Sequence, residues 1–178
     1  MIKESFKQEI VLPEGTELEI KDSEITMKAN GKENSRVFKT KGISFKKTDK
    51  GLEVEATPAK RSMNARLKTI VGHLQNMAKG LQEEYEYNLT IVFSHFPMSV
   101  NVKGDVLEIN NFAGEKKPRF SKILSGTTVT IKGKDVVVKG IDKETVGQTA
   151  ANMESATKVK NRDRRIFQDG IFIVSKGK

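Results

Sequence analysis

The sequence predicts an α+β fold of two tandem, duplicated modules, each a small antiparallel sheet with a helix packed on one face. Two similar runs of alternating apolar and polar residues, each followed by a helical apolar pattern, support this fold. The repeat recurs after roughly 84 residues, which indicates a duplication rather than a solenoid. We expect the first module to comprise residues 1–82 and the second residues 83–178, with the join near 82–84.

The first hairpin of each module is predicted from apolar alternation about a polar turn. In the first module, residues 18–21 lead through a polar turn to residues 25–27. In the second, residues 100–103 lead through Gly104-Asp105 to residues 107–109. Alternation on both sides of a turn-prone pair is typical of two antiparallel strands.

A second hairpin follows in each module. Ile43–Phe45 precedes Gly51–Val54 in the first, and Val129–Ile131 precedes Val136–Val138 in the second. Glycine and a Lys-Asp pair favour a tight reversal between the latter two strands. A further strand is predicted from Tyr85 to Phe93, where every second residue is apolar.

Each module is expected to close with a helix. The first is predicted from one apolar face with spacings of three and four, formed by Met63, Leu67, Ile70, Leu74, Met77 and Leu81. The second is predicted to begin after Asp142, a good N-cap, and to present a shorter stripe of Val146, Ala150 and Met153.

The charge balance predicts a polyanionic partner. The chain has 32 Lys and Arg against 23 Asp and Glu, a formal net charge of +9. Such an excess most often serves nucleic acid binding and less often an anionic membrane surface; solubility alone is the plainer interpretation. No apolar signal-peptide core and no run of roughly 18 apolar residues is present, so no membrane-spanning segment is expected. Of the two polyanions we expect nucleic acid, and no membrane, as the partner.

The residues that usually carry catalysis are missing. The sequence contains no Gly-x-Ser-x-Gly elbow, no P-loop and no Gly-x-Gly-x-x-Gly pattern. It has no cysteine, and its two histidines, His73 and His95, lack metal-ligand spacing. We therefore predict that the protein is not an enzyme and that it has no metal site.

Three basic clusters are the candidate binding residues. The predicted helix from Lys60 to Lys79 contains five cations and no acid, which fits either a solvated face or phosphate contact. The loop from Gly114 to Arg119, with Lys122 beyond it, is the second cluster; a mobile hairpin tip is the alternative interpretation. The third is the segment from Lys158 to Arg165.

The third cluster is predicted to be an anchored ribbon. If the segment is extended, Lys158, Lys160, Arg162 and Arg164 lie on one side of it and can follow a sugar–phosphate backbone. A strand pair, Ile166-Phe167 and Ile171–Val174 about a 168–170 turn, is expected to anchor it in the sheet, with Phe167 and Phe172 in the core. We expect Asp163 to order a neighbouring arginine. Without paired aromatics for base stacking, backbone and shape recognition of structured RNA is favoured.

Several segments resemble the sixth protein of the large ribosomal subunit in its archaeal and eukaryotic branch. The matching segments are His73 to Gly80, Glu86 to Pro97, Asn111 to Lys116, Gln148 to Glu154 and Lys158 to Phe172. They occur in the order and spacing of that family, and the resemblance covers essentially the whole chain. The sequence departs from the family pattern at Ala113, where a bulkier aliphatic residue is common, and at 81–84, which lacks a frequent glycine.

The resemblance implies a duplicated, non-enzymatic protein in the cytoplasm that needs no dedicated cofactor. It also implies binding to large-subunit ribosomal RNA, chiefly through the second module. It implies a position near the sarcin–ricin loop and the region where translational GTPases dock, with neighbouring ribosomal proteins as further partners. The alternative is a free-standing nucleic-acid-binding protein without sequence preference. The predicted RNA-binding residues are Gly114, Lys116, Lys117, Arg119, Lys122, Lys158, Lys160, Arg162, Arg164 and Arg165.

Overall fold

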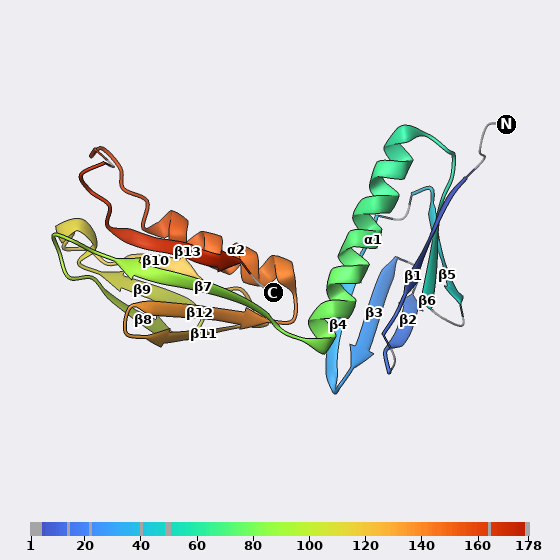
Figure 1. The fold of residues 1–178 in the computed structure, drawn as a ribbon, viewed down its shortest axis with the longest axis horizontal. Helices are drawn as coiled ribbons and strands as arrows, with labels where there is room; N and C mark the ends of the chain where they lie inside the picture. The colour runs from blue at the N-terminus through green and yellow to red at the C-terminus, as the bar shows by residue number, and fades with distance from the viewer. Residues whose placement is uncertain are drawn as a thin grey trace. The chain divides into compact units, whose positions relative to one another are not determined.

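The computed structural model describes residues 5–13, 15–21, 23–39, 41–48, 51–163 and 165–176. The chain forms two compact units, of which the first ends at Glu83 and the second begins at Glu84. Each unit combines antiparallel strands with one α-helix, so the predicted α+β fold with two modules is confirmed (Figure 1). The structure adds that the strands of each module form two sheets.

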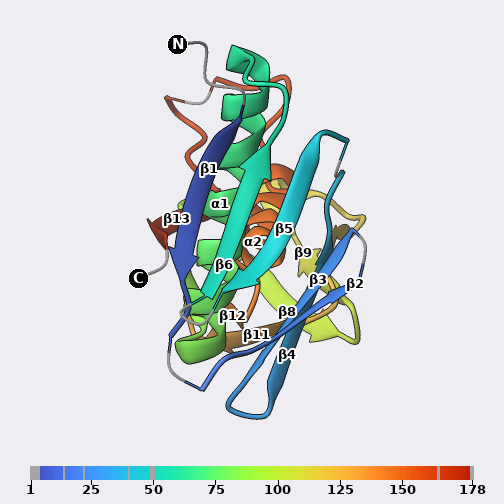
Figure 2. The same cartoon turned by 90° about the vertical axis from the view of Figure 1, so that its right-hand side faces the viewer.

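The described residues of the first module form six strands and one helix. The strands are β1 (Phe6–Val11), β2 (Glu17–Lys21), β3 (Glu24–Ala29), β4 (Lys32–Val37), β5 (Ile43–Thr48) and β6 (Gly51–Ala56), followed by α1 (Arg61–Gln82). One sheet has the order β1-β6-β5 and the other the order β2-β3-β4, as Figure 2 shows. The helix packs against strands of both sheets.

The core of the first module lies between its helix and its sheets. All six apolar residues predicted for the buried helix face are buried, from Met63 to Leu81. They meet the inward residues of the sheets, among them Met27 and Val54, which are fully buried. The two predicted hairpins are β2-β3 and β5-β6, while β1 and β4 were not predicted.

In the second module, the part of the chain that the structure describes forms seven strands, one α-helix and one short 3-10 turn. Its elements are β7 (Tyr85–Val92), β8 (Ser99–Lys103), β9 (Val106–Asn110), η1 (Phe112–Gly114), β10 (Arg119–Lys122), β11 (Thr127–Lys132), β12 (Asp135–Gly140), α2 (Lys143–Ala156) and β13 (Gly170–Lys176). The sheets have the orders β11-β12-β7-β13 and β10-β9-β8. Helix α2 contacts strands of both.

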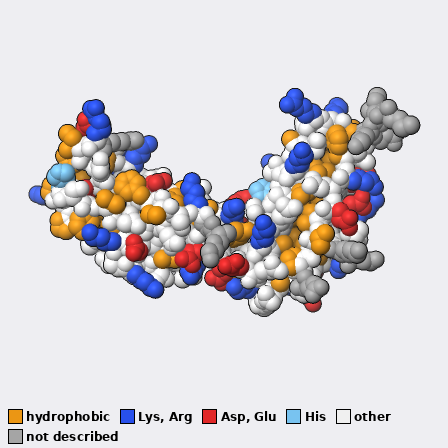
Figure 3. All heavy atoms as spheres, viewed as in Figure 1, with side chains coloured by type: hydrophobic (Ala, Val, Ile, Leu, Met, Phe, Trp, Pro, Cys, Tyr) orange, Lys and Arg blue, Asp and Glu red, His pale blue; other side chains and the backbone are white. Residues whose placement is uncertain are grey.

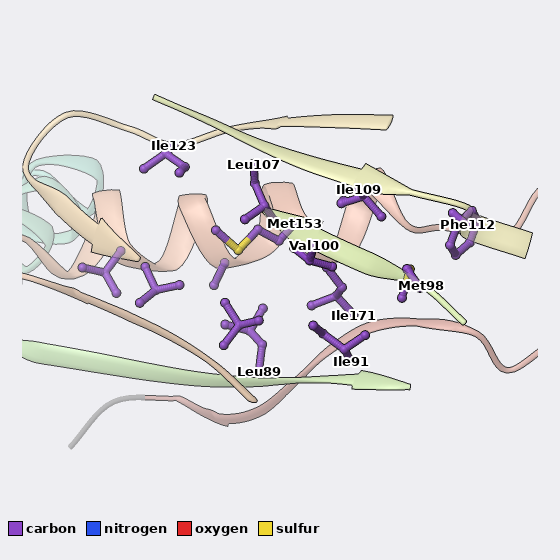
Figure 4. Close-up of a cluster of buried hydrophobic side chains, with 14 of the residues drawn as sticks. Leu89, Ile91, Met98, Val100, Leu107, Ile109, Phe112, Ile123, Met153 and Ile171 are labelled. Carbon is purple, nitrogen blue, oxygen red and sulfur yellow. The ribbon is translucent and has the colours of Figure 1, made fainter. Parts of the chain in front are cut away.

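The core of the second module is a single apolar cluster between α2 and the two sheets. Figure 4 shows Leu89 and Ile91 from β7, Leu107 and Ile109 from β9, and Met153 from α2 pointing toward one another. The predicted stripe of α2 is buried as expected, and the Asp142 carboxylate caps the helix by accepting a hydrogen bond from the Glu144 backbone N–H at 3.2 Å.

Candidate nucleic-acid interface

Two of the predicted basic clusters meet at Arg119. The first residue of β10, Arg119 donates two hydrogen bonds from Nη1, to the carbonyl oxygen of Ala156 at 2.8 Å and to that of Lys158 at 3.1 Å. It thereby joins the loop after β9 to the segment after α2. Both segments lie at the same end of the second module (Figure 1), from which Lys and Arg side chains project in Figure 3.

The guanidinium of Arg119 is held on its other edge by Glu115. Nε and Nη2 of Arg119 donate to the two carboxylate oxygens of Glu115, at 2.8 and 2.6 Å. The guanidinium also lies over the ring of Phe112, 4.2 Å from its centroid, and that ring is buried. The hydrogen bond from Arg119 lowers the pKa of Glu115, and the positive charges of Arg119 and Arg162 lower it further.

These contacts change the interpretation of Arg119. Its planar fork is occupied by protein acceptors, and its side chain is only 22% exposed. A lysine could not make these paired contacts in the same geometry. Arg119 therefore holds the two basic segments together, while the more exposed cations around it face solvent.

The third cluster is a loop rather than the predicted extended ribbon. Asn161 has a left-handed backbone, with φ of 58°. The carbonyl oxygen of Asp163 accepts hydrogen bonds from the N–H groups of Ile166 and Phe167, at 3.2 and 2.9 Å, which closes a turn. The ribbon prediction is wrong because these turns prevent a two-residue repeat. Arg164, one of the predicted contacts, lies outside the described residues.

The base of this loop is fixed by two buried polar side chains. Thr157 Oγ1 accepts a hydrogen bond from the Ile171 N–H at 2.9 Å, which ties the end of α2 to the start of β13. Asp169 Oδ1 accepts one from the Ser94 N–H at 2.8 Å. Both side chains are buried. The basic loop is therefore held at the point where it leaves and rejoins the fold.

The predicted strand pair is only half present. β13 does dock in the sheet, where Ile171 pairs with Ile91 of β7 and is fully buried. Ile166, however, lies outside any strand and is 61% exposed, because the chain turns there instead of running along the sheet. One strand anchors the basic loop, not two.

Asp163 orders a neighbouring arginine, as expected. Its carboxylate accepts hydrogen bonds from Nε and Nη2 of Arg165 at 3.2 and 2.9 Å, and from the Arg165 backbone N–H at 2.9 Å. These bonds lower the pKa of Asp163 and raise that of Arg165. Arg165 remains exposed, but its charge is partly compensated.

Seven of the predicted cations are exposed at the surface of the second module: Lys116, Lys117, Lys122, Lys158, Lys160, Arg162 and Arg165. Arg162 lies over the ring of Phe167, 4.8 Å from its centroid, which directs its guanidinium. Gly114 has a φ of 79°, and a Cβ added there would lie 3.1 Å from the Phe96 ring. Gly114 therefore shapes the loop that carries Lys116 and Lys117.

The sequence pattern did not predict an apolar pocket that lies beside the basic loop. It measures about 650 Å³ and is lined by Val159, Phe167, Asp169 and Phe172, among others. Phe172 was predicted to lie in the core, but it is 43% exposed, and Phe167 is half-buried. The signal was present: adjacent residues of a strand face opposite sides, so with Ile171 inside, Phe172 must point outward.

The described residues contain no cluster of three His, Asp or Glu side chains placed to hold a metal ion. Among the same residues, no helix has the length and hydropathy needed to cross a membrane. Two α+β modules, the second with exposed cations on two segments joined by Arg119, have the features typical of polyanion-binding proteins.

Comparison with known proteins identifies the family. The family model for ribosomal protein L6 matches residues 96–170. The large ribosomal subunit protein uL6 of Methanococcus vannielii is 46% identical over 96% of this chain and 94% of that protein. That of Methanosarcina mazei is 43% identical over 99% of both chains, and that of Ignicoccus hospitalis is 44% identical over 93% and 91%.

The chain belongs to the ribosomal protein L6 family. This membership confirms the resemblance inferred from the sequence, including its archaeal relatives. It also confirms that the protein is a structural ribosomal protein and not an enzyme.

Proposed function

We propose that the chain is a constituent of the large ribosomal subunit in the cytoplasm and binds the ribosomal RNA of that subunit mainly through its second module. The names of its relatives, each a large-subunit protein, support the assembly. The proposed position is near the sarcin–ricin loop and the region where translational GTPases dock, as the sequence resemblance implies. Neighbouring ribosomal proteins are its other partners there.

The contact of Arg119 with both basic segments supports the proposal that the second module is the main RNA-binding module. Because Arg119 fixes the carbonyl of Lys158, cations from two distant parts of the sequence share one surface. Such preorganisation lowers the entropy cost of binding a phosphate backbone. The proposed contacts are Lys116, Lys117, Lys122, Lys158, Lys160 and Arg162. Arg165, whose charge is partly compensated by Asp163, is a weaker contact, and Gly114 and Arg119 are supports.

Chemical footprinting of intact large-subunit ribosomal RNA tests this function. The wild-type protein should protect a few helices, including the sarcin–ricin region, and Lys160→Gln/Arg162→Gln should lose those protections while its melting temperature stays within about 2 °C. The matched control is Lys132→Gln/Lys139→Gln, which removes two charges from β11 and β12, across β7 from β13. It should leave the footprint unchanged.

Two results would overturn the proposal. Equal loss of protection in the double variant and its control would show that total charge, not this surface, determines binding. Protection spread over many unrelated helices, with equal competition from unrelated RNA, would identify a general nucleic-acid binder instead.

A further inference from the structure

The exposed face of α1 carries positive charge without any acid. The helix has 22 residues, and no Asp or Glu occurs among them. Arg61, Lys68 and Lys79 lie seven and eleven positions apart, which places them within about 20° of one line along the helix at 3.6 residues per turn. All three are exposed. They form a cationic stripe about 27 Å long at 1.5 Å per residue.

The cations of this stripe form no ion pair with the described residues of the first module. No carboxylate there forms an ion pair with Arg61, Arg66, Lys68 or Lys79. Figure 3 shows Lys and Arg side chains along the helix.

The outer face of the sheet β1-β6-β5 is different, because its cations are paired. Lys7 lies 3.4 Å from Glu53 and 3.7 Å from Glu55, and Lys46 lies 3.7 Å from Glu55. The cations of α1 therefore differ from Lys7 and Lys46 in having no carboxylate partner among the described residues.

The start of α1 breaks the local rules that favour a helix. Its N-cap, Lys60, makes no side-chain capping bond, and its first turn contains Arg61 and no acid. Cations at this end oppose the helix dipole. The corresponding helix of the second module follows the rules, with the Asp142 cap and Glu144 in its first turn. The positive charge of α1 is thus kept at some expense of helix stability, which is typical of functional surfaces.

No packing contact within the fold explains why position 72 is a glycine. It lies in the middle of α1, within about 20° of the line through Arg61. A Cβ added there would meet no atom within 4 Å, so no neighbour in the fold requires a glycine. Glycine in a helix interior weakens the helix relative to alanine. Because Gly72 has no side chain, the backbone of a partner can approach the helix closely between Lys68 and Lys79.

We propose that the exposed face of α1 is a second ribosomal RNA-binding surface, which contacts a sugar–phosphate backbone through Arg61, Lys68 and Lys79. The inference rests on the proposed function, because it takes ribosomal RNA as the partner. An unneutralised row of cations that lacks exposed large apolar residues fits phosphates better than a protein surface. Each module then holds RNA by its own surface.

Because the chain has no cysteine, a single introduced thiol can place a chemical probe at one site. Gln75→Cys, exposed on the stripe side of α1, would carry an iron chelate that releases hydroxyl radicals in assembled large subunits. We expect it to cleave ribosomal RNA at a defined strand. Ser44→Cys, exposed on β5, is the control and should cleave that strand weakly or not at all.

A charge variant gives the second readout. Arg61→Gln/Lys68→Gln/Lys79→Gln should lose the protections near that strand, keep those of the second module, and lower the slope of log affinity against log salt by about three. The matched control, Lys7→Gln/Lys28→Gln/Lys46→Gln, removes the same charge from the paired cations of the sheets. It should keep the α1 protections.

The outcomes separate this inference from the proposed function. If wild-type protein protects no large-subunit RNA, the proposed function fails. If it protects RNA but Gln75→Cys cleaves no more than Ser44→Cys, or the α1 variant behaves as its control does, only the α1 inference fails. If a neighbouring protein covers the exposed face of α1 in the subunit, the proposed function holds and only the α1 inference fails.

Discussion

The guanidinium of Arg119 and the backbone carbonyl of Lys158 are joined by a hydrogen bond of 3.1 Å, across 39 residues of sequence. The same guanidinium is held by both carboxylate oxygens of Glu115. A side chain with a fixed charge thus connects two loops whose own cations point to solvent. The surface is organised by a residue that is itself mostly covered.

Arg119→Lys should therefore damage RNA binding although it keeps the charge. Lysine cannot engage Glu115 with two parallel bonds and the two carbonyls at once, so we expect a stability loss of about 1–3 kcal/mol. We also expect RNA affinity to fall about tenfold, because the loop after α2 loses preorganisation. Hydrogen exchange of residues 157–163 should accelerate.

Arg162→Lys is the matched control for this change. Arg162 is exposed, and its described contact is with the ring of Phe167, so lysine should leave amide exchange of the loop nearly unchanged. If Arg119→Lys leaves both exchange and RNA affinity as in the wild type, Arg119 has no positioning role.

The elements that the sequence predicted well are those with a local apolar period. The face from Met63 to Leu81 and the alternation from Tyr85 to Phe93 both place apolar side chains inside, and a neighbouring hairpin or helix then covers them. Strand β4 has the sequence Lys-Glu-Asn-Ser-Arg-Val, whose side chains are at most half-buried. Its pairing with β3 decides its structure, and that partner cannot be read from a local pattern.

In the candidate site, too, local patterns predicted some features, while contacts distant in sequence determined the others. Composition located the cations, since long basic runs stand out in any sequence. The geometry depended on contacts distant in sequence: Arg119 with Lys158, and Asp169 with Ser94. The left-handed Asn161, which turns the segment away from an extended path, has no signal in the basic pattern.

The stability of the second module should depend on Glu115 in acid. Because the Arg119 hydrogen bond lowers the pKa of Glu115 below its ordinary value of 4.5, the folded state favours the ionised carboxylate. Its contribution is fully present above the unfolded pKa and is lost as pH falls through the lower, folded pKa. Urea unfolding of wild type and Glu115→Gln should differ at pH 7 and converge near pH 2. A difference that persists at low pH would contradict this ion pair.

Gly114→Ala should destabilise the loop that carries Lys116 and Lys117. The substitution puts a side chain at a φ of 79° and brings its Cβ to 3.1 Å from Phe96, for an expected cost of about 1–2 kcal/mol in urea unfolding. Gly133→Ala measures the cost of the positive φ alone. Gly133 has a φ of 63°, and a Cβ added there has open space around it. An equal cost for both variants would mean that Phe96 gives way freely.

Thr157→Val should loosen the base of the basic loop. Valine has nearly the same shape but leaves the buried Ile171 N–H without the hydroxyl that now accepts its hydrogen bond at 2.9 Å. We expect a loss of about 1–3 kcal/mol and faster exchange of the Ile171 amide. Thr157→Ser keeps the hydroxyl and should protect that amide as the wild type does. If serine and valine behave alike, packing of the methyl group, not the hydrogen bond, holds the loop.

RNA binding by the second module should depend steeply on salt. The proposed contacts are Lys116, Lys117, Lys122, Lys158, Lys160 and Arg162. If each of these six meets a phosphate, affinity for a matching ribosomal RNA fragment should fall roughly a thousandfold between 50 and 200 mM monovalent salt. Lys160→Gln/Arg162→Gln should lower the slope of log affinity against log salt by about two, since two contacts are lost. Filter binding over that range measures both. A flat response would refute phosphate contact, and an unchanged slope in the variant would place the contacts on other cations.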